Sequence, residues 1–376
     1  MRKRKGRNKR RKKLIIISSI ITLIIAGIIV GGYLFSIRSY DKMEEIDTYT
    51  ESASDNGSYV RFAKGILRYS RDGIVLFDAK GEELWNHSCQ MKTPMIESCG
   101  NTAVIGDKGG SDVLVLTRDG VKGEFKTSHP IENLSVSSQG IVAAVLKEDT
   151  TPRLICYDAK GTVLVEQRAS LTNTGYPMDV EISQNGKILV ASYLCVNENA
   201  VSTKIVYYNF DEGIEEHQTS EKVYLDTMIP KVEFVDASKV LLVSDKSLIF
   251  WEGTKKPEEK QEIKIEKEIK SVACDKENIA LVLKNKEDSN YELRVYDMKG
   301  KQCLSKNISE EYENLKIVDR QVILYEGTKC QIVTLSGVVR FKGTADVTID
   351  EIYPIVGIDK YMVVGPAGMK KVHLTK

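Results

Sequence analysis

The chain has 376 residues, 42% of them hydrophobic, which is enough for one large folded domain or two ordinary ones and argues against disorder throughout. Its formal net charge of +1 conceals an asymmetry. The first 13 residues contain ten Lys or Arg and no acidic residue, leaving 44 Lys and Arg against 53 Asp and Glu, a net charge of about −9, in the remainder. This mildly acidic body argues against a nucleic-acid-binding domain.

Residues 14–37 follow the basic head directly and form an uncharged run dominated by Ile and Leu. A helix of roughly 20 apolar residues crosses a bilayer, whereas the apolar region of a secretory signal is only about 7–15 residues long. The length therefore favours an uncleaved transmembrane helix. Cleavage stays open because Gly31, Gly32 and Ser36 are small, although no clear A-x-A site is present.

The charges that flank this run predict its orientation. Lys and Arg are retained on the cytoplasmic side of a membrane. After the run, Arg38 and Lys42 are outnumbered by four acidic residues up to position 47. We therefore expect a single-pass protein of the cell membrane, with residues 1–13 as a basic cytoplasmic tail and an extracytoplasmic C-terminal domain. An RNA-binding arm is the alternative for the head, but topogenic charge and contact with anionic lipid explain it more simply.

The body of the chain reads as β-structure. Residues 38–58 are predicted to be a polar linker, because Ser, Thr, Asp, Asn and Gly concentrate toward their end. Residues 59–376 consist of short alternating apolar runs rich in Val, Ile, Tyr and Leu, separated by turns such as Asp72-Gly73 and Asn185-Gly186. No amphipathic helical stretch of convincing length interrupts them, so we expect an all-β domain.

A repeat runs through this domain: an apolar strand, an Asp or polar residue, a Gly turn and a second strand. It is clearest at Asp78-Ala79-Lys80-Gly81, Asp158-Ala159-Lys160-Gly161 and Asp297-Met298-Lys299-Gly300, and weaker copies turn at Gly120, Gly213, Gly253 and Gly337. Six intervals cover the 256 residues from the first of these glycines to the last, a mean near 43. A four-stranded propeller blade has about 40–45 residues.

Each repeat supplies four strand-like runs, which predicts a β-propeller of eight blades, with seven as the alternative. A two-domain β-sandwich would not explain the period. Residues 369–374 read as the third strand of a last blade that has no fourth strand after it. We expect a strand from the other end of the domain, residues 59–63 or the segment just before them, to close the ring.

Two resemblances follow from particular residues. The Asp78-Ala79-Lys80-Gly81 turn running into Leu84-Trp85 is similar to the repeat of propellers related to quinoprotein dehydrogenases, a superfamily that also includes non-enzymatic outer-membrane assembly scaffolds. Trp85 is expected to pack between blades. The basic head, the single span and residues 65–73, 175–179, 183–186 and 208–210 together resemble a family of membrane-anchored propeller proteins of unknown function from Gram-positive bacteria. This resemblance implies an extracytoplasmic propeller and carries over no catalytic residues.

Motifs of several enzyme classes are absent from the sequence, which has no P-loop, no H-E-x-x-H and no G-x-S-x-G. The four histidines (His87, His129, His217, His373) are far apart, so no metal site is expected. The seven cysteines (Cys89, Cys99, Cys156, Cys195, Cys274, Cys303, Cys330) are odd in number and lack C-x-x-C. Whether Cys89 and Cys99 form a disulfide stays open. We predict no catalytic residue and no cofactor, and cofactor-binding residues are unknown.

Three functions are compatible with these features. The first is a non-catalytic interaction scaffold that binds an envelope protein or cell-wall polymer, with no nucleic-acid partner. The second is a propeller enzyme of the envelope, quinone-dependent or glycan-hydrolysing, the latter needing two carboxylates that converge in the propeller channel. The third is a sensory or assembly partner that acts through its helix, where Gly27 and Gly31 form one G-x-x-x-G.

Overall fold

The computed structural model describes residues 22, 24–27, 30–32, 37–49, 57–148, 151–169, 175–197, 200–211, 217–285, 290–366 and 368–376. Residues 22, 24–27 and 30–32 are helical. No helix within the described part of the chain is both long and apolar enough to cross a membrane. The predicted tail and most of the predicted span 14–37 lie outside the described residues, so the transmembrane helix stays a prediction.

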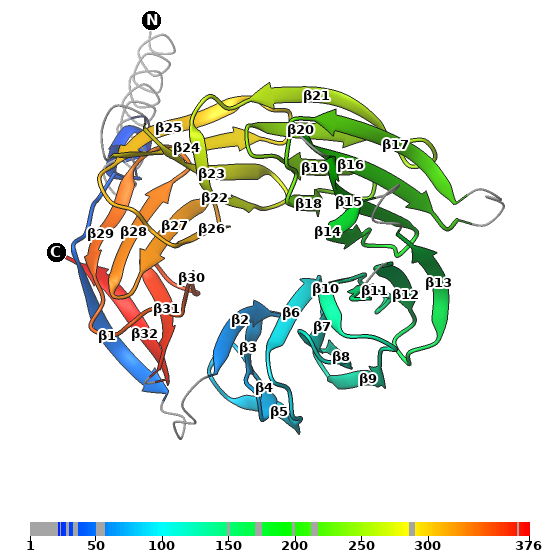
Figure 1. Ribbon diagram of the computed structural model, residues 1–376. Helices are drawn as coiled ribbons and strands as arrows, with labels where there is room; N and C mark the ends of the chain where they lie inside the picture. The colour runs from blue at the N-terminus through cyan, green and yellow to red at the C-terminus, as the bar shows by residue number, and fades with distance from the viewer. Residues whose placement is uncertain are drawn as a thin grey trace, which may run out of the picture.

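The remainder of the described chain forms eight four-stranded antiparallel sheets arranged as the blades of a ring (Figure 1). Blades 1 to 4, each from the innermost strand outward, are β2 (Ser58–Phe62), β3 (Gly65–Tyr69), β4 (Gly73–Phe77), β5 (Glu83–Ser88); β6 (Pro94–Cys99), β7 (Thr102–Asp107), β8 (Asp112–Thr117), β9 (Gly120–Lys126); β10 (Ile131–Val136), β11 (Val142–Leu146), β12 (Arg153–Tyr157), β13 (Val163–Arg168); and β14 (Tyr176–Ile182), β15 (Ile188–Asn197), β16 (Ala200–Asn209), β17 (Gln218–Leu225). Blades 5 to 7 are β18 (Lys231–Phe234), β19 (Lys239–Val243), β20 (Ser247–Glu252), β21 (Glu258–Lys264); β22 (Glu268–Cys274), β23 (Asn278–Lys284), β24 (Tyr291–Asp297), β25 (Gln302–Ile308); and β26 (Asn314–Val318), β27 (Gln321–Glu326), β28 (Lys329–Thr334), β29 (Val339–Thr344). The predicted all-β class and eight-bladed propeller are confirmed.

Blade 8 combines both ends of the chain. Its inner strands are β30 (Glu351–Pro354), β31 (Lys360–Gly365) and β32 (Gly368–Thr375), and its outermost strand is β1 (Lys42–Tyr49). β1 pairs antiparallel with β32, so that Met43 lies opposite Leu374. Closure by a strand from the other end of the chain is confirmed, but residues 59–63 do not supply it, because β2 belongs to blade 1. The predicted linker 38–58 is also wrong because it contains β1. The linker prediction failed because Met43 is the one buried side chain of residues 42–48, so the strand reads as polar.

The Asp-x-Lys-Gly repeats form the turns between the third and fourth strands of the blades. In the first, Asp78 Oδ1 accepts backbone N–H bonds from Lys80 (2.8 Å) and Glu82 (2.9 Å), and Gly81 has a φ of 84°. Asp side chains favour such turns, and Gly adopts positive φ without steric cost. The turns at Gly120, Gly161, Gly253, Gly300 and Gly337 occupy the same place in their blades, and Gly213 lies outside the described residues.

Packing between neighbouring blades forms the core. Middle strands are covered on both sides, so all six residues of β7 and all five of β11 are buried, whereas the outermost β5 alternates between exposed and half-buried residues. Trp85 on β5 packs against the cluster shared by blades 1 and 2 and donates its indole N–H to the carbonyl of Arg118 (2.8 Å). This contact confirms the predicted packing role of Trp85.

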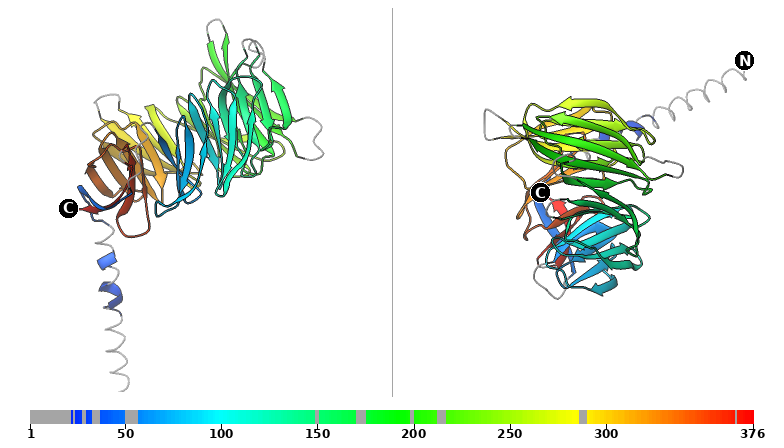
Figure 2. Two further views of the ribbon diagram at one scale, coloured as in Figure 1. Left: turned by 90° about the horizontal axis from the view of Figure 1, so that it is seen from below. Right: turned by 45° about the vertical axis from the view of Figure 1, so that its right-hand side comes forward.

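The strand order defines two faces of the ring. Innermost strands begin at one face, which we call the distal face, and end at the other, which we call the N-terminal face. Because outermost strands run antiparallel to their neighbours, β1 begins at the N-terminal face, where Lys42 pairs with Thr375 at the end of β32. Figure 2 shows the described helical residues beyond this face, while the long green hairpin of blade 4 projects from the other side of the ring. The chain therefore joins the propeller at the face opposite the blade 4 hairpin.

Candidate functional site

Charged side chains of three inner strands form a cluster, which we call the channel cluster. Its members are Glu97 on β6, Asp179 and Glu181 on β14, and Lys231 and Glu233 on β18. Their charges act on one another across blades 2, 4 and 5. Lys231 Nζ lies 3.2 Å from a carboxylate oxygen of Glu233. Four carboxyl groups and one ammonium group thus share the inner wall of the ring.

Asp179 is held by groups from the two adjacent blades. Its Oδ1 accepts a hydrogen bond from the side-chain amide of Asn133 on β10 (2.8 Å). Its Oδ2 accepts one from the backbone N–H of Val232 on β18 (2.8 Å). Burial nevertheless outweighs these bonds and raises the pKa of Asp179 above its ordinary value. The side chain links blades 3, 4 and 5 and is therefore fixed in position.

Glu181 and Glu97 hold their protons near neutral pH. Burial, reinforced by the charge of Glu233, raises the pKa of Glu181 to about 8, although Ser135 donates a hydrogen bond to its Oε2 (2.8 Å). Burial likewise raises the pKa of Glu97 to about 7, against the opposing effect of Lys231. Glu97 is nevertheless exposed to solvent. The cluster can therefore take up and release protons in the physiological range.

Two of the cavities on the distal face are notable for their size. One, of about 600 Å³, lies at the distal ends of β6, β10 and β14 and includes Met95, Asn133 and Met178 in its lining. It reaches the channel cluster through Asn133, which bonds Asp179. The other, of about 700 Å³, is lined by Tyr59, Glu313, Asp350 and their neighbours between blades 7, 8 and 1. Cavities of this size accommodate small ligands.

Blade 4 extends beyond the other blades on the distal face. Its β15 and β16 have ten residues each, whereas the second and third strands of the other blades have five to eight. Val196 and Val201 face each other near the end of this hairpin, and Leu225 pairs with the same hairpin from β17. Val196 is 70% exposed and Leu225 is 75% exposed, and Val201, Val223 and Met228 nearby are also exposed. We call these five residues the blade 4 patch.

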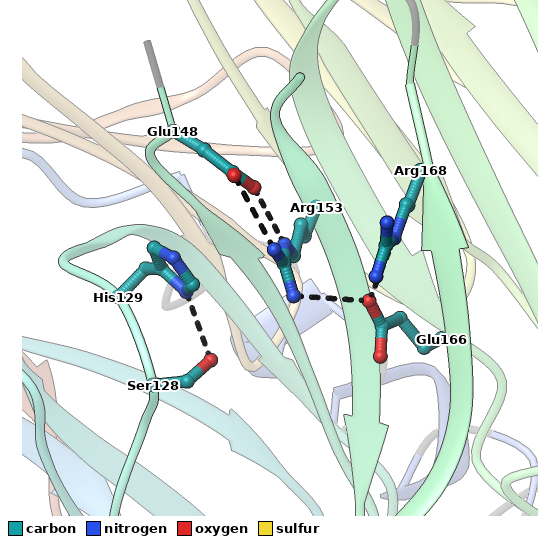
Figure 3. Close-up of polar contacts among 6 residues, drawn as sticks. All are labelled: Ser128, His129, Glu148, Arg153, Glu166 and Arg168. Atoms are coloured by element: carbon teal, nitrogen blue, oxygen red, sulfur yellow. Dashed lines mark hydrogen bonds and ion pairs between the residues drawn. The ribbon is translucent and has the colours of Figure 1, made fainter. Parts of the chain in front are cut away.

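A charged network braces the distal edge of blade 3 (Figure 3). Arg153 donates from Nε to Glu148 (2.6 Å) and from Nη1 to Glu166 (3.2 Å), and Glu166 also accepts a bond from Arg168 (3.2 Å). The carboxylates of Glu148 and Glu166 thus each face at least one guanidinium group. His129 points instead to the hydroxyl of Ser128, its neighbour in the chain (2.9 Å). The network holds β12, β13 and the preceding loop together.

The histidines and cysteines singled out in the sequence are dispersed. His87 lies on β5, His217 precedes β17, and His373 lies on β32. Within the described ranges, no three His, Cys, Asp or Glu side chains are placed to hold a metal ion. None of the seven cysteines forms a disulfide, so Cys89 and Cys99 are not bonded to each other in this structure. Sequence reasoning named neither the channel cluster nor the blade 4 patch.

Comparison with known proteins identifies the fold and a family. The chain is similar to a crystal structure of a eukaryotic initiation factor, with 13% identity, a TM-score of 0.51, and coverage of 89% of this chain and 92% of that one. It is also similar to Hsv2p of Kluyveromyces lactis (10% identity, TM-score 0.49, 78% and 97% covered) and to the Pan2 WD40 domain of Neurospora crassa (7% identity, TM-score 0.47, 90% and 99% covered). At 13% identity the likeness to the initiation factor shows the fold alone.

No curated protein matches the chain. A sequence family does match, and the match covers residues 36–374, which include the whole propeller from β1 to all but the last residue of β32. The chain belongs to DUF5711, a family of unknown function.

Proposed function

We propose that this protein is a non-catalytic scaffold of the cell membrane, tethered by residues 14–37, with residues 1–13 in the cytoplasm and the propeller outside. The observation that carries the proposal is the position of the blade 4 patch. The chain joins the propeller at the N-terminal face, and the patch lies on the distal face. A tether at one face leaves the other free to meet a partner.

The chemistry of the patch favours an envelope protein over cell-wall polymer as the partner. Glycan strands carry many hydroxyl groups, whereas the patch presents Val, Leu and Met side chains. Exposed apolar groups that gather on a projecting element are typical of protein-binding surfaces. The projecting hairpin also offers backbone groups at its edge, through which a partner strand can add.

Site-specific photo-crosslinking in living cells tests this proposal. A photoreactive amino acid replaces Leu225 in one variant and Val163 in the other, since Val163 is an exposed apolar residue of blade 3 (52% exposed) outside the patch. We expect a discrete crosslinked protein from position 225 that is missing from position 163, and that disappears when Val196→Lys is added. Equal crosslinking from both positions, or none from 225, would contradict the scaffold function.

The channel cluster keeps one enzymatic alternative open. Glycan hydrolysis uses one protonated and one ionised carboxyl group, and Glu181 with its raised pKa has the property of the acid. If the protein is such an enzyme, Glu181→Gln abolishes release of soluble sugar from purified cell wall. If it is a scaffold, wild type and Glu181→Gln release none, and the crosslink at position 225 is retained.

A further inference from the structure

The point where the chain joins the propeller is locked by a buried clamp. Asp359 accepts hydrogen bonds from the hydroxyl of Tyr40 (2.8 Å) and from Nε of Arg340 (2.8 Å). Arg340 also donates to the backbone carbonyl of Arg38 (3.3 Å) and lies over the ring of Tyr40, 5.2 Å from its centroid. The side chains of Arg340 and Asp359 are only 9% and 5% exposed. The propeller is therefore fixed to the chain from Arg38 onward.

The same clamp holds an apolar loop on the N-terminal face. Residues 355–359 connect β30 to β31, and Val356 is 99% exposed while Ile358 is 64% exposed. The loop is closed by the backbone bond from Ile355 N–H to the carbonyl of Lys360 (3.0 Å) and is anchored by Asp359. Two large apolar side chains are thus held in solvent, without packing, beside the point where the chain joins the propeller.

The apolar run ends immediately before the clamp. Residue 37 is the last of the run, and Tyr40 already bonds the backbone of Arg340. Three extended residues span at most about 10 Å. A bilayer crossed by the run must therefore lie within about that distance of the N-terminal face, because no flexible linker intervenes.

Some of the turns on this face also carry exposed cations. The Asp-x-Lys-Gly turns of blades 1, 3 and 6 lie on it and carry the exposed Lys80, Lys160 and Lys299. Their Asp side chains are turned inward to the backbone, as Asp297 is to the N–H groups of Lys299 (2.9 Å) and Lys301 (2.8 Å). Lysines near a headgroup layer attract anionic lipid, and apolar side chains enter the boundary beneath it.

We propose that Val356 and Ile358 insert into the headgroup–acyl boundary of the bilayer, so that the propeller lies with its N-terminal face on the membrane and its distal face outward. This inference rests on the proposed tether. The helix and the loop then hold the disc at two neighbouring points, which restricts tilting, and the blade 4 patch is presented to partners at a fixed height.

Lipid quenching of introduced tryptophans tests this arrangement in the full-length chain. The protein is reconstituted in nanodiscs of phosphatidylcholine and phosphatidylglycerol, with or without bromine in the acyl chains. Val356→Trp is compared with Val196→Trp, which places the probe at another exposed apolar position, on the distal face. The native Trp85 and Trp251 give a common baseline, which is subtracted. We expect a blue shift and a loss of emission in brominated discs for Val356→Trp and neither for Val196→Trp.

Three other results would overturn the inference. If neither probe is quenched while the chain stays with the discs through an alkaline carbonate wash, the tether stands and the loop does not insert. If both probes are quenched equally, the propeller has no fixed orientation. If the wash removes the chain from the discs, the tether itself fails, and the proposed insertion fails with it. Ile358→Trp repeats the test at the second position.

Discussion

The clamp at the start of the propeller makes a quantitative prediction about ring closure. In Asp359→Ala, the guanidinium group of Arg340 stays buried without its carboxylate, and the hydroxyl of Tyr40 loses its acceptor. Removing one partner of a buried ion pair costs about 3–5 kcal/mol. Release of residues 38–49 exposes Arg340 to water and relieves this cost. We therefore expect Asp359→Ala to lower the free energy for local opening of β1 by about 3 kcal/mol or more.

Hydrogen exchange measured by mass spectrometry reads this opening directly. The amides of β1 should exchange on the order of 100-fold faster in Asp359→Ala than in wild type, since 1.4 kcal/mol is a factor of about ten. Lys187→Ala is the control, because it breaks an exposed ion pair with Asp211 (53% and 48% exposed). It should change the free energy of local opening by less than about 1 kcal/mol. The apolar double variant Arg340→Met with Asp359→Leu should recover most of the protection.

Acceleration of less than about tenfold in Asp359→Ala would refute this reasoning, because the clamp would then contribute no more than a surface pair. Uniform acceleration in every blade would also refute it, since the predicted defect is local to β1 and its partner β32.

Three further predictions concern β1, the channel cluster and the blade 4 patch. Met43→Ala should destabilise the protein by about 2 kcal/mol because Met43 packs between blades 7 and 8, whereas the exposed Ile46→Ala should cost less than about 0.5 kcal/mol. The pKa of Glu181 is about 8 in the folded state and near 4.5 in the unfolded state. Between these pH values the folded state therefore binds more protons than the unfolded state. The free energy of unfolding should fall as the pH rises through this window. Glu181→Gln should flatten that slope. Leu225→Lys should leave the melting temperature unchanged and abolish the crosslink formed from position 196.

Thermal unfolding followed by circular dichroism checks each of these variants. Equal losses for Met43→Ala and Ile46→Ala would mean that β1 does not pack as described. An unchanged pH slope in Glu181→Gln would contradict the raised pKa of that carboxyl group. A crosslink that survives Leu225→Lys would place partner binding elsewhere on the propeller.

Turn chemistry made the fold predictable from the sequence. Asp and Gly recur at the same place in blades 1, 3 and 6 because a tight turn between the third and fourth strands needs a positive φ, as at Gly81. β1 was not predicted as a strand because an outermost strand buries only one of its sides. Among residues 42–48, Met43 is the one side chain that is buried. The propeller begins directly after the apolar run, with Tyr40 and β1, and no linker separates the two.

The candidate sites were hidden for a different reason. Glu97 and Glu181 come from blades 2 and 4, and alternation along a strand says which residues point inward but not which blades face each other across the ring. The clamp joins Tyr40 to Asp359, residues 319 positions apart. These two residues meet only because the ring closes, and no local sequence pattern indicates that contact. Exposed Val356 and Ile358 likewise look like strand residues until their loop is placed.

The most direct test of the account is the side of the membrane on which the propeller lies, and Cys303 provides a native probe. It is the one exposed cysteine, whereas burial raises the pKa of the thiols of Cys156 and Cys274 to about 12 and makes them unreactive. A membrane-impermeant maleimide is added to cells whose wall has been removed. We expect labelling of wild type without lysis and none of Cys303→Ser. Labelling that appears only after the membrane is permeabilised would place the propeller inside the cell and contradict the account.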